Sequence, residues 1–491
     1  MHILIYGASK RGKSLFAENL IIQAIAKEHT PVIIIDPKGD AGMRARLRAC
    51  AQRAQAPFHS LDFAEPASSA TYNPLSGCHD PDQVGDRIAE LCDHGEGAGY
   101  WRGRAAGTAR VVARAFDAVR RYLEACGGLC ALAPPDSRAR ELNRGYTELP
   151  SEFTPVGWLP RLSVLDLYGV DAVHRLLAWM LRVVYAHLFD GDPAEPERCD
   201  REQALAWWEE YARAPGHPDD AHATRCGPLA EVRRQLLRIR TLMDHEHDEL
   251  SKANSSLFEA LERFRGRVAI ITDTHSPQIV WDQVAASRAV VYFSLAAQEY
   301  GDLAAGFARI LCADLVSWCG RRTRSRQDSP WYLLADEVDR WIPSCFTDFL
   351  ARGRSAGLRC IAIGQTRASF ATRLGHNGRQ IIEGNVATVV QFAAKGAEDA
   401  LAAARLSGTV HLLLRDVSVS TSSGNAAAAR RGPSDQPDDG MQASQTIGCR
   451  QLATEAFPAW AVQNLPTGIA LIITQRGPAL VGIPELASPD R

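Results

Sequence analysis

The stretch Gly7-Ala8-Ser9-Lys10-Arg11-Gly12-Lys13-Ser14 decides the fold of this 491-residue chain, because it fits the phosphate-loop pattern G-x-x-x-x-G-K-[ST]. A short apolar strand is expected just before it over Ile3–Tyr6, and helical periodicity follows over Ser14–Ala26. In that setting the glycines let backbone N–H groups face phosphate oxygens at a helix N-terminus. Lys13 is expected to reach the β- and γ-phosphates, and the Ser14 hydroxyl to hold Mg²⁺. The alternative is a glycine-rich turn with an incidental lysine, which the strand–loop–helix setting disfavours.

A second stretch, Trp331–Glu337, is an apolar strand that ends in two carboxylates. Asp336 is expected to bind Mg²⁺ through Ser14 or water, and Glu337 to polarise the attacking water. Such a pair at a strand end is often only an acidic turn, but a phosphate loop in the same chain favours catalysis. The two stretches together predict ATP hydrolysis with Mg²⁺ as cofactor, rather than phosphate transfer to a small acceptor.

Length and composition set the limits of this interpretation. The chain is long enough for one large domain with insertions or for two to three domains, and its 46% hydrophobic and 23% charged residues are typical of a soluble globular protein. A net charge of −2 gives no global argument for nucleic acid. The 12 cysteines are scattered without paired C-x-x-C sets, which favours reduced thiols in a cytosolic protein and no zinc site. The sequence has no run of 18 apolar residues, so we expect no membrane-spanning segment.

The order of apolar runs predicts an α/β fold with a mostly parallel sheet, helices on both faces and an inserted all-α domain. We assign residues 1–95 to the first part of the nucleotide-binding domain, 96–265 to the all-α insertion and 266–491 to the second part. Residues 418–445 lack apolar periodicity and predict a disordered loop. The remaining expected strands are Pro31–Asp36, Phe58–Phe63, Val268–Thr272, Ala289–Leu295, Leu358–Gly364 and Val386–Phe392, with a final hairpin over Ile469–Thr474 and Ala479–Ile483.

Further side chains are candidates for the nucleotide site. Gln365 closes the strand after the acidic one, where its amide can contact the γ-phosphate or position water. Arg352 and Arg354 lie at the end of the helix expected after the acidic strand. Either could act as an arginine finger that contacts the nucleotide of a neighbouring subunit, and Arg354 is the preferred candidate. The alternatives are an ordinary strand-end glutamine and arginines that complement a helix dipole.

Other charged residues stay undecided. Asp36 and Lys38 lie in a turn at the expected carboxyl edge of the sheet, where they either support the site or only cap the turn. The arginines at 321, 322, 324 and 326 either line a DNA path or form a solvated linker, and the linker is favoured.

Several motifs resemble the TraD/TraG family of type IV secretion coupling proteins, with the TraD-type conjugative coupling factors the best fit. They occur in family order from end to end, with an all-α domain inserted where the family has one. The matching motifs are Ile34-Ile35-Asp36-Pro37-Lys38-Gly39-Asp40, Tyr72-Asn73-Pro74-Leu75, Leu334-Ala335-Asp336-Glu337, Ala351-Arg352-Gly353-Arg354-Ser355-Ala356-Gly357-Leu358, Gly364-Gln365-Thr366, Gly384-Asn385-Val386 and Leu465-Pro466-Thr467-Gly468.

The resemblance implies a RecA-like P-loop NTPase that assembles as a homo-hexamer and is related to FtsK and HerA translocases. It implies that the protein moves DNA, single-stranded or double-stranded. It also implies that the protein connects a relaxase or relaxosome to the type IV secretion channel during conjugation. By motif match, Lys13 and Ser14 take the phosphate-loop roles and Asp336 and Glu337 the Mg²⁺ and water roles, while Gln365 and Arg354 match the sensor and the inter-subunit arginine.

The chain also departs from the family. Members usually have transmembrane helices before the nucleotide domain, whereas this sequence starts at the strand of the phosphate loop. We therefore expect a cytoplasmic protein, held at the inner face of the inner membrane through a missing anchor or a partner. Two alternative functions remain: a related FtsK/HerA-like motor with another cargo, and a nucleotide-gated substrate receptor without motor activity.

Overall fold

The computed structural model describes residues 2–78, 80–91, 98–126, 177, 178, 180, 181, 201–212, 228–244, 269–272, 277–343, 345–423 and 441–484. The chain divides into two compact units, and each is described by itself. The first unit comprises Met1–Tyr6, Lys13–Val389 and Pro484–Arg491, and the second comprises Gly7–Gly12 and Val390–Ile483.

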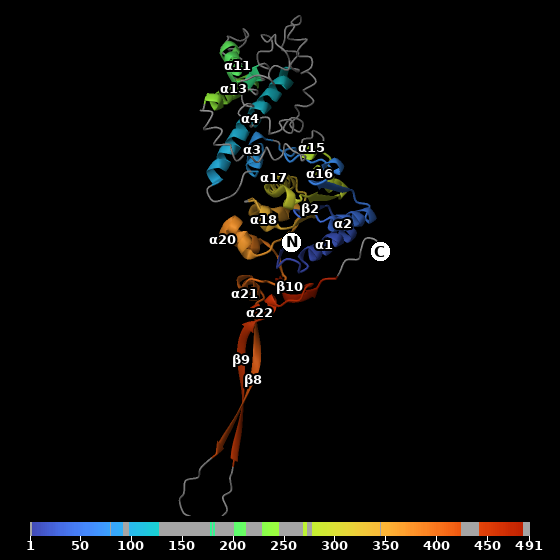
Figure 1. The fold of residues 1–491 in the computed structure, drawn as a ribbon, viewed down its shortest axis with the longest axis vertical. Coiled ribbons are helices and arrows are strands. Elements are labelled where there is room, and N and C mark those ends of the chain that lie inside the picture. Colours follow the sequence, from blue (N-terminus) through green and yellow to red (C-terminus); the bar gives the residue numbers. More distant parts are fainter. Residues whose placement is uncertain are drawn as a thin grey trace, which may run out of the picture. The chain divides into compact units, whose positions relative to one another are not determined.

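A parallel β-sheet forms the centre of the first unit (Figure 1). Its strands lie in the order β1, β6, β5, β2, β4, β3, and every neighbouring pair is parallel. All residues of β2 and β4 are buried, as expected for parallel strands covered on both faces. The predicted α/β fold with a mostly parallel sheet is thus confirmed. The strands are β1 (Ile3–Tyr6), β2 (Val32–Asp36), β3 (Phe58–Asp62), β4 (Val290–Ser294), β5 (Trp331–Ala335) and β6 (Leu358–Ile363), and β7 (Thr388–Gln391) follows α20.

Helices connect these strands, as a parallel sheet requires. One short segment differs from the prediction: the expected strand over Val268–Thr272 is wrong, because residues 269–272 form the helical turn α15. A short apolar run fits a buried helical turn as well as a strand. The connecting helices are α1 (Lys13–Gln23), η1 (Ala24–Glu28), α2 (Ala41–Arg53), η2 (Pro66–Ser68), α15 (Ala269–Thr272), α16 (Trp281–Ser287), α17 (Ala297–Arg324), α18 (Val338–Trp341), α19 (Phe346–Gly353), η6 (Arg354–Ala356) and α20 (Arg367–Asn385).

The longest of these helices, α17, belongs to the core. Phe307, Leu311, Leu315 and Trp318 recur at helical spacing and are fully buried. Among the described helices α17 alone has the length and apolar composition of a membrane span, but most of its apolar stretch is buried inside the protein. Its burial against the sheet accounts for that composition.

The predicted all-α insertion is helical wherever the structure describes it. Described residues between 98 and 244 lie in α4 (Ala98–Cys126), in short helical pieces at 177–178 and 180–181, in α11 (Arg201–Trp207), η4 (Trp208–Ala212) and α13 (Pro228–Asp244). Ion pairs Arg114–Asp82 (2.6 Å) and Arg110–Asp86 join α4 to α3 (Pro81–Ala89). The rest of the region 96–265 lies outside the described residues, so its domain boundaries stay a prediction.

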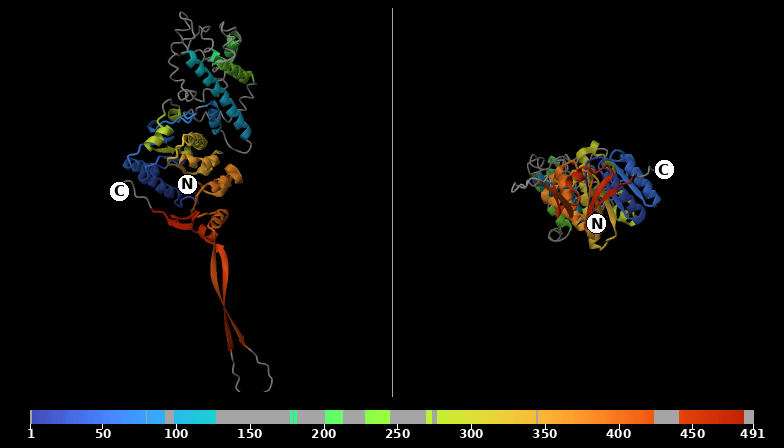
Figure 2. Two further views of the ribbon diagram at one scale, coloured as in Figure 1. Left: turned by 180° about the vertical axis from the view of Figure 1, so that it is seen from behind. Right: turned by 90° about the horizontal axis from the view of Figure 1, so that it is seen from below.

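The second unit contains two antiparallel strand pairs. The predicted final hairpin is confirmed as β10 (Ile469–Thr474) and β11 (Gly477–Gly482). The long strands β8 (Thr409–Ser423) and β9 (Met441–Glu455) form a twisted two-stranded ribbon, which Figure 2 shows from behind. Helices α21 (Ala397–Leu406) and α22 (Ala459–Gln463) complete the described elements of this unit.

The ribbon corrects the predicted disordered loop over 418–445. Residues 418–423 and 441–445 are paired strand residues, with Val419 opposite Gln445, and residues 424–440 lie outside the described part of the chain. The prediction failed because the composition of one strand does not show that a partner strand, also polar, hydrogen-bonds to it from far along the chain.

Candidate nucleotide-binding site

The acidic pair lies at the carboxyl end of β5, between β2 and β6. Asp336 is 3% exposed, and its carboxylate accepts a hydrogen bond from the N–H of Glu337 at 2.9 Å. The indole of Trp341 donates to the Asp336 carbonyl at 3.0 Å. Glu337 has a left-handed backbone (φ 43°, ψ 39°) where the strand turns into α18, a strained conformation that costs on the order of 1 kcal/mol or more. These bonds hold Asp336 at the edge where open α/β sheets bind ligands.

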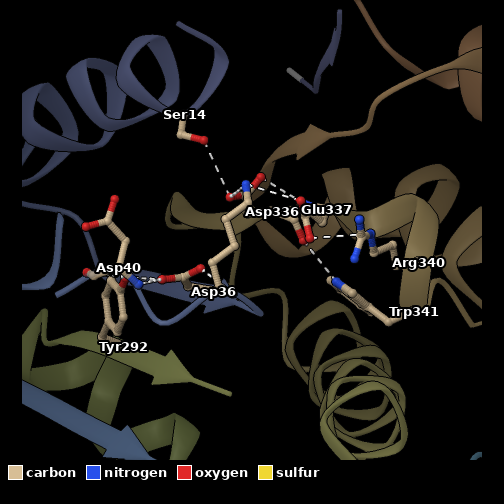
Figure 3. A network of polar contacts seen from close by, with 9 residues as sticks. Ser14, Asp36, Asp40, Tyr292, Asp336, Glu337, Arg340 and Trp341 are labelled. Carbon is tan, nitrogen blue, oxygen red and sulfur yellow. Dashed lines mark hydrogen bonds and ion pairs between the residues drawn. The ribbon is translucent and has the colours of Figure 1, made fainter. Parts of the chain in front are cut away.

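Lys13 and Ser14, at the start of α1, lie next to this pair. The Ser14 hydroxyl is 3.5 Å from Asp336 Oδ2 (Figure 3). Burial lowers the pKa of Lys13 and the charge of Lys38 lowers it further, while Asp336, Asp339 and Glu337 oppose the shift. The structure thus brings together side chains that the sequence separates by over three hundred positions.

Lys38 bridges the acidic pair, and Arg340 adds a second ion pair to Glu337, with its Nε 3.5 Å from Glu337 Oε2. The Lys38 Nζ lies 3.0 Å from Asp336 Oδ2 and 3.4 Å from Glu337 Oε1. Burial alone would lower the pKa of Lys38, but its interactions with Asp336 and Glu337 outweigh burial and raise that pKa. Of the two residues that the sequence left undecided, Lys38 therefore belongs to the site.

Asp36 has the other role, because it caps the turn that presents Lys38. Its carboxylate accepts hydrogen bonds from the backbone N–H groups of Lys38 (2.9 Å) and Asp40 (2.6 Å) and from the Tyr292 hydroxyl (2.5 Å; Figure 3). Burial raises the pKa of Asp36, and the Tyr292 hydrogen bond opposes that rise. A side chain saturated in this way positions the loop rather than binding a ligand.

Gln365 follows β6, next to β5, as predicted. Its backbone N–H donates to the carboxylate of Asp339 at 3.3 Å, and the Ser369 hydroxyl donates to the same oxygen at 2.6 Å. Sequence reasoning missed Asp339 and Ser369. The only available signals were the third acid in Asp336-Glu337-Val338-Asp339 and the Thr366-x-x-Ser369 pattern that caps α20.

Arg354 is not part of this cluster. It is exposed in η6, just before β6 begins, so it lies toward the amino edge of the sheet while Asp336 lies at the carboxyl edge. Arg352 is exposed as well. Any contact of either arginine with nucleotide therefore has to be made in another copy of the chain, and the inter-subunit role stays a prediction.

The linker interpretation of the arginines before β5 is wrong for three of the four, while the DNA path stays a prediction for the arginines other than Arg322. Arg321, Arg322 and Arg324 form the last turn of α17 rather than a linker. Arg322 is buried and donates to the carbonyl oxygens of Ala356 (3.0 Å) and Ser329 (2.8 Å), so its role is structural.

The glycine-rich part of the phosphate loop, Gly7–Gly12, belongs to the second unit and takes the backbone shape that the motif predicts. Gly7 and Gly12 have φ values of 146° and 103°, and Lys10 also has a positive φ of 62°. A Cβ on Gly7 would come within 2.5 Å of the Phe392 side chain, so only glycine fits there. The Ala8 N–H donates to the Ala393 carbonyl at 3.0 Å.

The donor set suits Mg²⁺ held together with a nucleotide. Within the described part of the chain, no group of three or more His, Cys, Asp or Glu side chains is arranged to hold a metal ion. Mg²⁺ usually takes only one or two protein oxygens and completes its shell with phosphates and waters. Ser14 Oγ and Asp336 Oδ2 fit that pattern.

Comparison with known proteins supports the family resemblance. The family model described as the TraM recognition site of TraD and TraG matches residues 330–448, which include Asp336, Glu337, Arg354 and Gln365. These residues carry the TraD and TraG signature. The resemblance inferred from the sequence motifs is thus confirmed over this segment. No curated protein matches the sequence.

Solved structures of a coupling protein share the fold. The bacterial conjugative coupling protein TrwBdeltaN70 in its unbound monoclinic form is 13% identical, with a TM-score of 0.53, and the match covers 100% of this chain and 86% of that one. TrwB in complex with ADP and Mg²⁺ is 13% identical with a TM-score of 0.53, covering 99% and 86%. TrwB in complex with the ATP analogue ADPNP is 13% identical with a TM-score of 0.50, covering 99% and 86%. At this identity the likeness shows the fold.

Proposed function

We propose that this chain is an ATP-hydrolysing motor that moves DNA as a conjugative coupling protein. The observation that carries the proposal is the approach of Ser14 Oγ to Asp336 Oδ2, at 3.5 Å, with Glu337 as the next residue. A phosphate-loop hydroxyl beside a strand-end carboxylate is the arrangement that holds Mg²⁺ in phosphate-loop hydrolases.

Each residue has one part in this proposal. Lys13 binds the β- and γ-phosphates, Ser14 and Asp336 hold Mg²⁺, and Glu337 orients and deprotonates the attacking water. Bound Mg²⁺ neutralises charge that develops on the phosphates. Lys38 holds both acidic side chains in place before nucleotide arrives and exchanges those ion pairs for new partners when it binds.

The family resemblance supports the choice of cargo and partners. The TraD and TraG segment and the TrwB fold favour a coupling protein over another motor, and TrwB structures contain ADP with Mg²⁺ or an ATP analogue. We accordingly infer ATP and Mg²⁺ as cofactors, DNA as cargo, and a relaxosome and type IV secretion channel as partners. In this proposal the chain acts as a homo-hexamer at the inner face of the inner membrane, with Arg354 and Gln365 completing the site.

The test is phosphate release by the purified protein, with and without single-stranded DNA, at low and at physiological salt. Wild type is expected to hydrolyse ATP, to be stimulated by DNA, and to lose stimulation as salt rises, because phosphate contacts release counterions. Lys13→Ala is expected to abolish hydrolysis. Equal hydrolysis rates for Lys13→Ala and wild type would refute ATP hydrolysis at this site. An oligomeric preparation whose ATPase rate does not change when DNA is added would refute the proposed motor function.

A further inference from the structure

Asp339 is buried beside the site without a role in the assignments above. It lies on α18, three residues after Asp336, and is 5% exposed. Its two carboxylate oxygens differ. Oδ2 accepts from the Ser369 hydroxyl at 2.6 Å and from the Gln365 N–H at 3.3 Å, whereas Oδ1 is buried and accepts no hydrogen bond from the residues that the structure describes. A buried carboxylate oxygen without a donor is costly, so the arrangement calls for a donor that this state does not supply.

The carboxylate of Asp339 contributes to the charged surroundings of the phosphate-loop lysine. Asp339 interacts electrostatically with Lys13, together with Asp336 and Glu337. The donors that nucleotide binding would bring near these residues are the Lys13 ammonium, once it rearranges, and phosphate-bound or Mg²⁺-bound water. Either would satisfy Oδ1 only when the site is loaded.

The partner of Oδ2 can adopt two arrangements. The Ser369 hydroxyl lies 2.6 Å from Asp339 Oδ2 and 2.7 Å from the Thr366 carbonyl oxygen. It has one proton, so it can donate to only one of these acceptors at a time. Ser369 also lies in the first turn of α20, whose N-cap is Thr366, and Gln365 directly precedes that cap.

We propose that Asp339 is a positioning residue that couples occupancy of the nucleotide site to the Gln365–Ser369 segment. Before nucleotide binds, Asp339 holds the segment through the Ser369 hydroxyl and the Gln365 N–H. When a donor from the nucleotide-bound site hydrogen-bonds to Oδ1, the carboxylate reorients. The Ser369 hydroxyl then donates its hydrogen bond to the Thr366 carbonyl instead of Asp339, and Gln365 is repositioned. This inference rests on the proposed ATP hydrolysis and deepens it.

The first test is Asp339→Asn, with Asp348→Asn as a matched control on an exposed aspartate of α19. Asparagine keeps one acceptor oxygen for Ser369 and Gln365 but puts an NH₂ donor in the place of Oδ1, so that no acceptor is left there for a donor from the nucleotide site. We expect kcat for ATP to fall about 10- to 100-fold, as for outer-shell residues of metal sites, with KM changed less than about twofold. The control is expected to match wild type in both constants.

A second readout does not depend on catalysis. Amide hydrogen exchange of a peptide spanning residues 363–370 is measured without ligand and with ADPNP and Mg²⁺. Wild type is expected to change its exchange rate on nucleotide binding, and Asp339→Asn to lose that response while still binding the analogue. Ser369→Ala supplies an independent variant, since it removes the switching proton. Combined with Asp339→Asn it is expected to lower kcat no further than Asp339→Asn does alone.

The outcomes separate the two levels of the proposal. A wild-type exchange response that survives in both Asp339→Asn and Ser369→Ala overturns the coupling, and so does a kcat of Asp339→Asn within twofold of wild type. Wild-type protein that binds ADPNP with an exchange response but hydrolyses no ATP overturns the proposed activity and leaves the coupling supported.

Discussion

Replacing Lys38 by methionine tests how the carboxylates of Asp336 and Glu337 are held before metal and nucleotide bind. The substitution keeps the aliphatic stem and removes the ammonium that lies 3.0 Å from Asp336 and 3.4 Å from Glu337. Any divalent cation that binds Asp336 has to displace that ammonium first. The variant is therefore expected to bind Mn²⁺, a paramagnetic substitute for Mg²⁺, more tightly than wild type in the absence of nucleotide.

The size of the effect follows from burial. The side chains of Asp336 and Glu337 are 4% and 13% exposed, but that of Lys38 is 44% exposed, so water screens both pairs. Partly exposed ion pairs contribute up to about 1 kcal/mol each. We assign about 1 kcal/mol to the shorter pair and about half of that to the longer one. A total of about 1.5 kcal/mol corresponds to roughly a tenfold difference in affinity.

The assay is titration of Mn²⁺ followed by electron paramagnetic resonance of the free ion, with Lys27→Met as control for an exposed lysine of η1. Because the folded-state pKa of Lys38 is raised, the ammonium stays charged below the ordinary lysine pKa and is lost only as pH rises through the higher folded value. The tenfold difference is expected to be constant between about pH 6 and 9. Equal Mn²⁺ affinities for Lys38→Met and wild type would refute the idea that the Lys38 ammonium competes with a divalent cation for Asp336.

Four more outcomes are expected. Glu337→Gln should retain binding of ATP with Mg²⁺ but lower kcat about 100-fold or more, measured by phosphate release, because it removes the proposed base. Asp314→Ala should lower the free energy of unfolding by about 3–5 kcal/mol in a denaturant titration, because it leaves the buried Arg87 without its 2.9 Å ion pair. Burial lowers the pKa of His2 to about 4, so acidification from about pH 6.5 to 4 should cost up to about 3 kcal/mol of stability, and His2→Gln should flatten that dependence. Arg354→Ala should lower kcat at least about 1,000-fold in assembled protein without changing ATP affinity in isolated copies.

The central fold could be predicted because its signals are local. The strands Val32–Asp36 and Val290–Ser294 are continuous apolar runs, and they are buried along their whole length. The ribbon β8–β9 could not be predicted, because its polar strands gain their hydrogen bonds from each other across a long separation. The run before Thr272 was ambiguous for the opposite reason: a few apolar residues fit either type of element.

The site was predictable where a motif fixes the chemistry and not where tertiary contacts do. Lys13, Ser14, Asp336 and Glu337 follow from two motifs and the rule that parallel strands share a carboxyl edge. The roles of Asp36 and Lys38 could not be separated, because the partners of Lys38 lie nearly three hundred residues away. The structure separates them by showing one saturated by its own turn and the other paired across the sheet edge.

Charge balance explains why such a site needs more than the residues of one edge. Three cations, Lys13, Lys38 and Arg340, stand against three carboxylates, Asp336, Glu337 and Asp339, so the cluster is already balanced before a nucleotide binds. A magnesium nucleotide is itself an anion, and its arrival adds negative charge while displacing Lys38 from its partners. Binding is favourable only if further positive groups face the phosphates, from the amides of the glycine loop and from cations outside this edge. An arginine contributed by a second copy would make hydrolysis conditional on assembly, so that ATP is consumed only where a complete ring can use it.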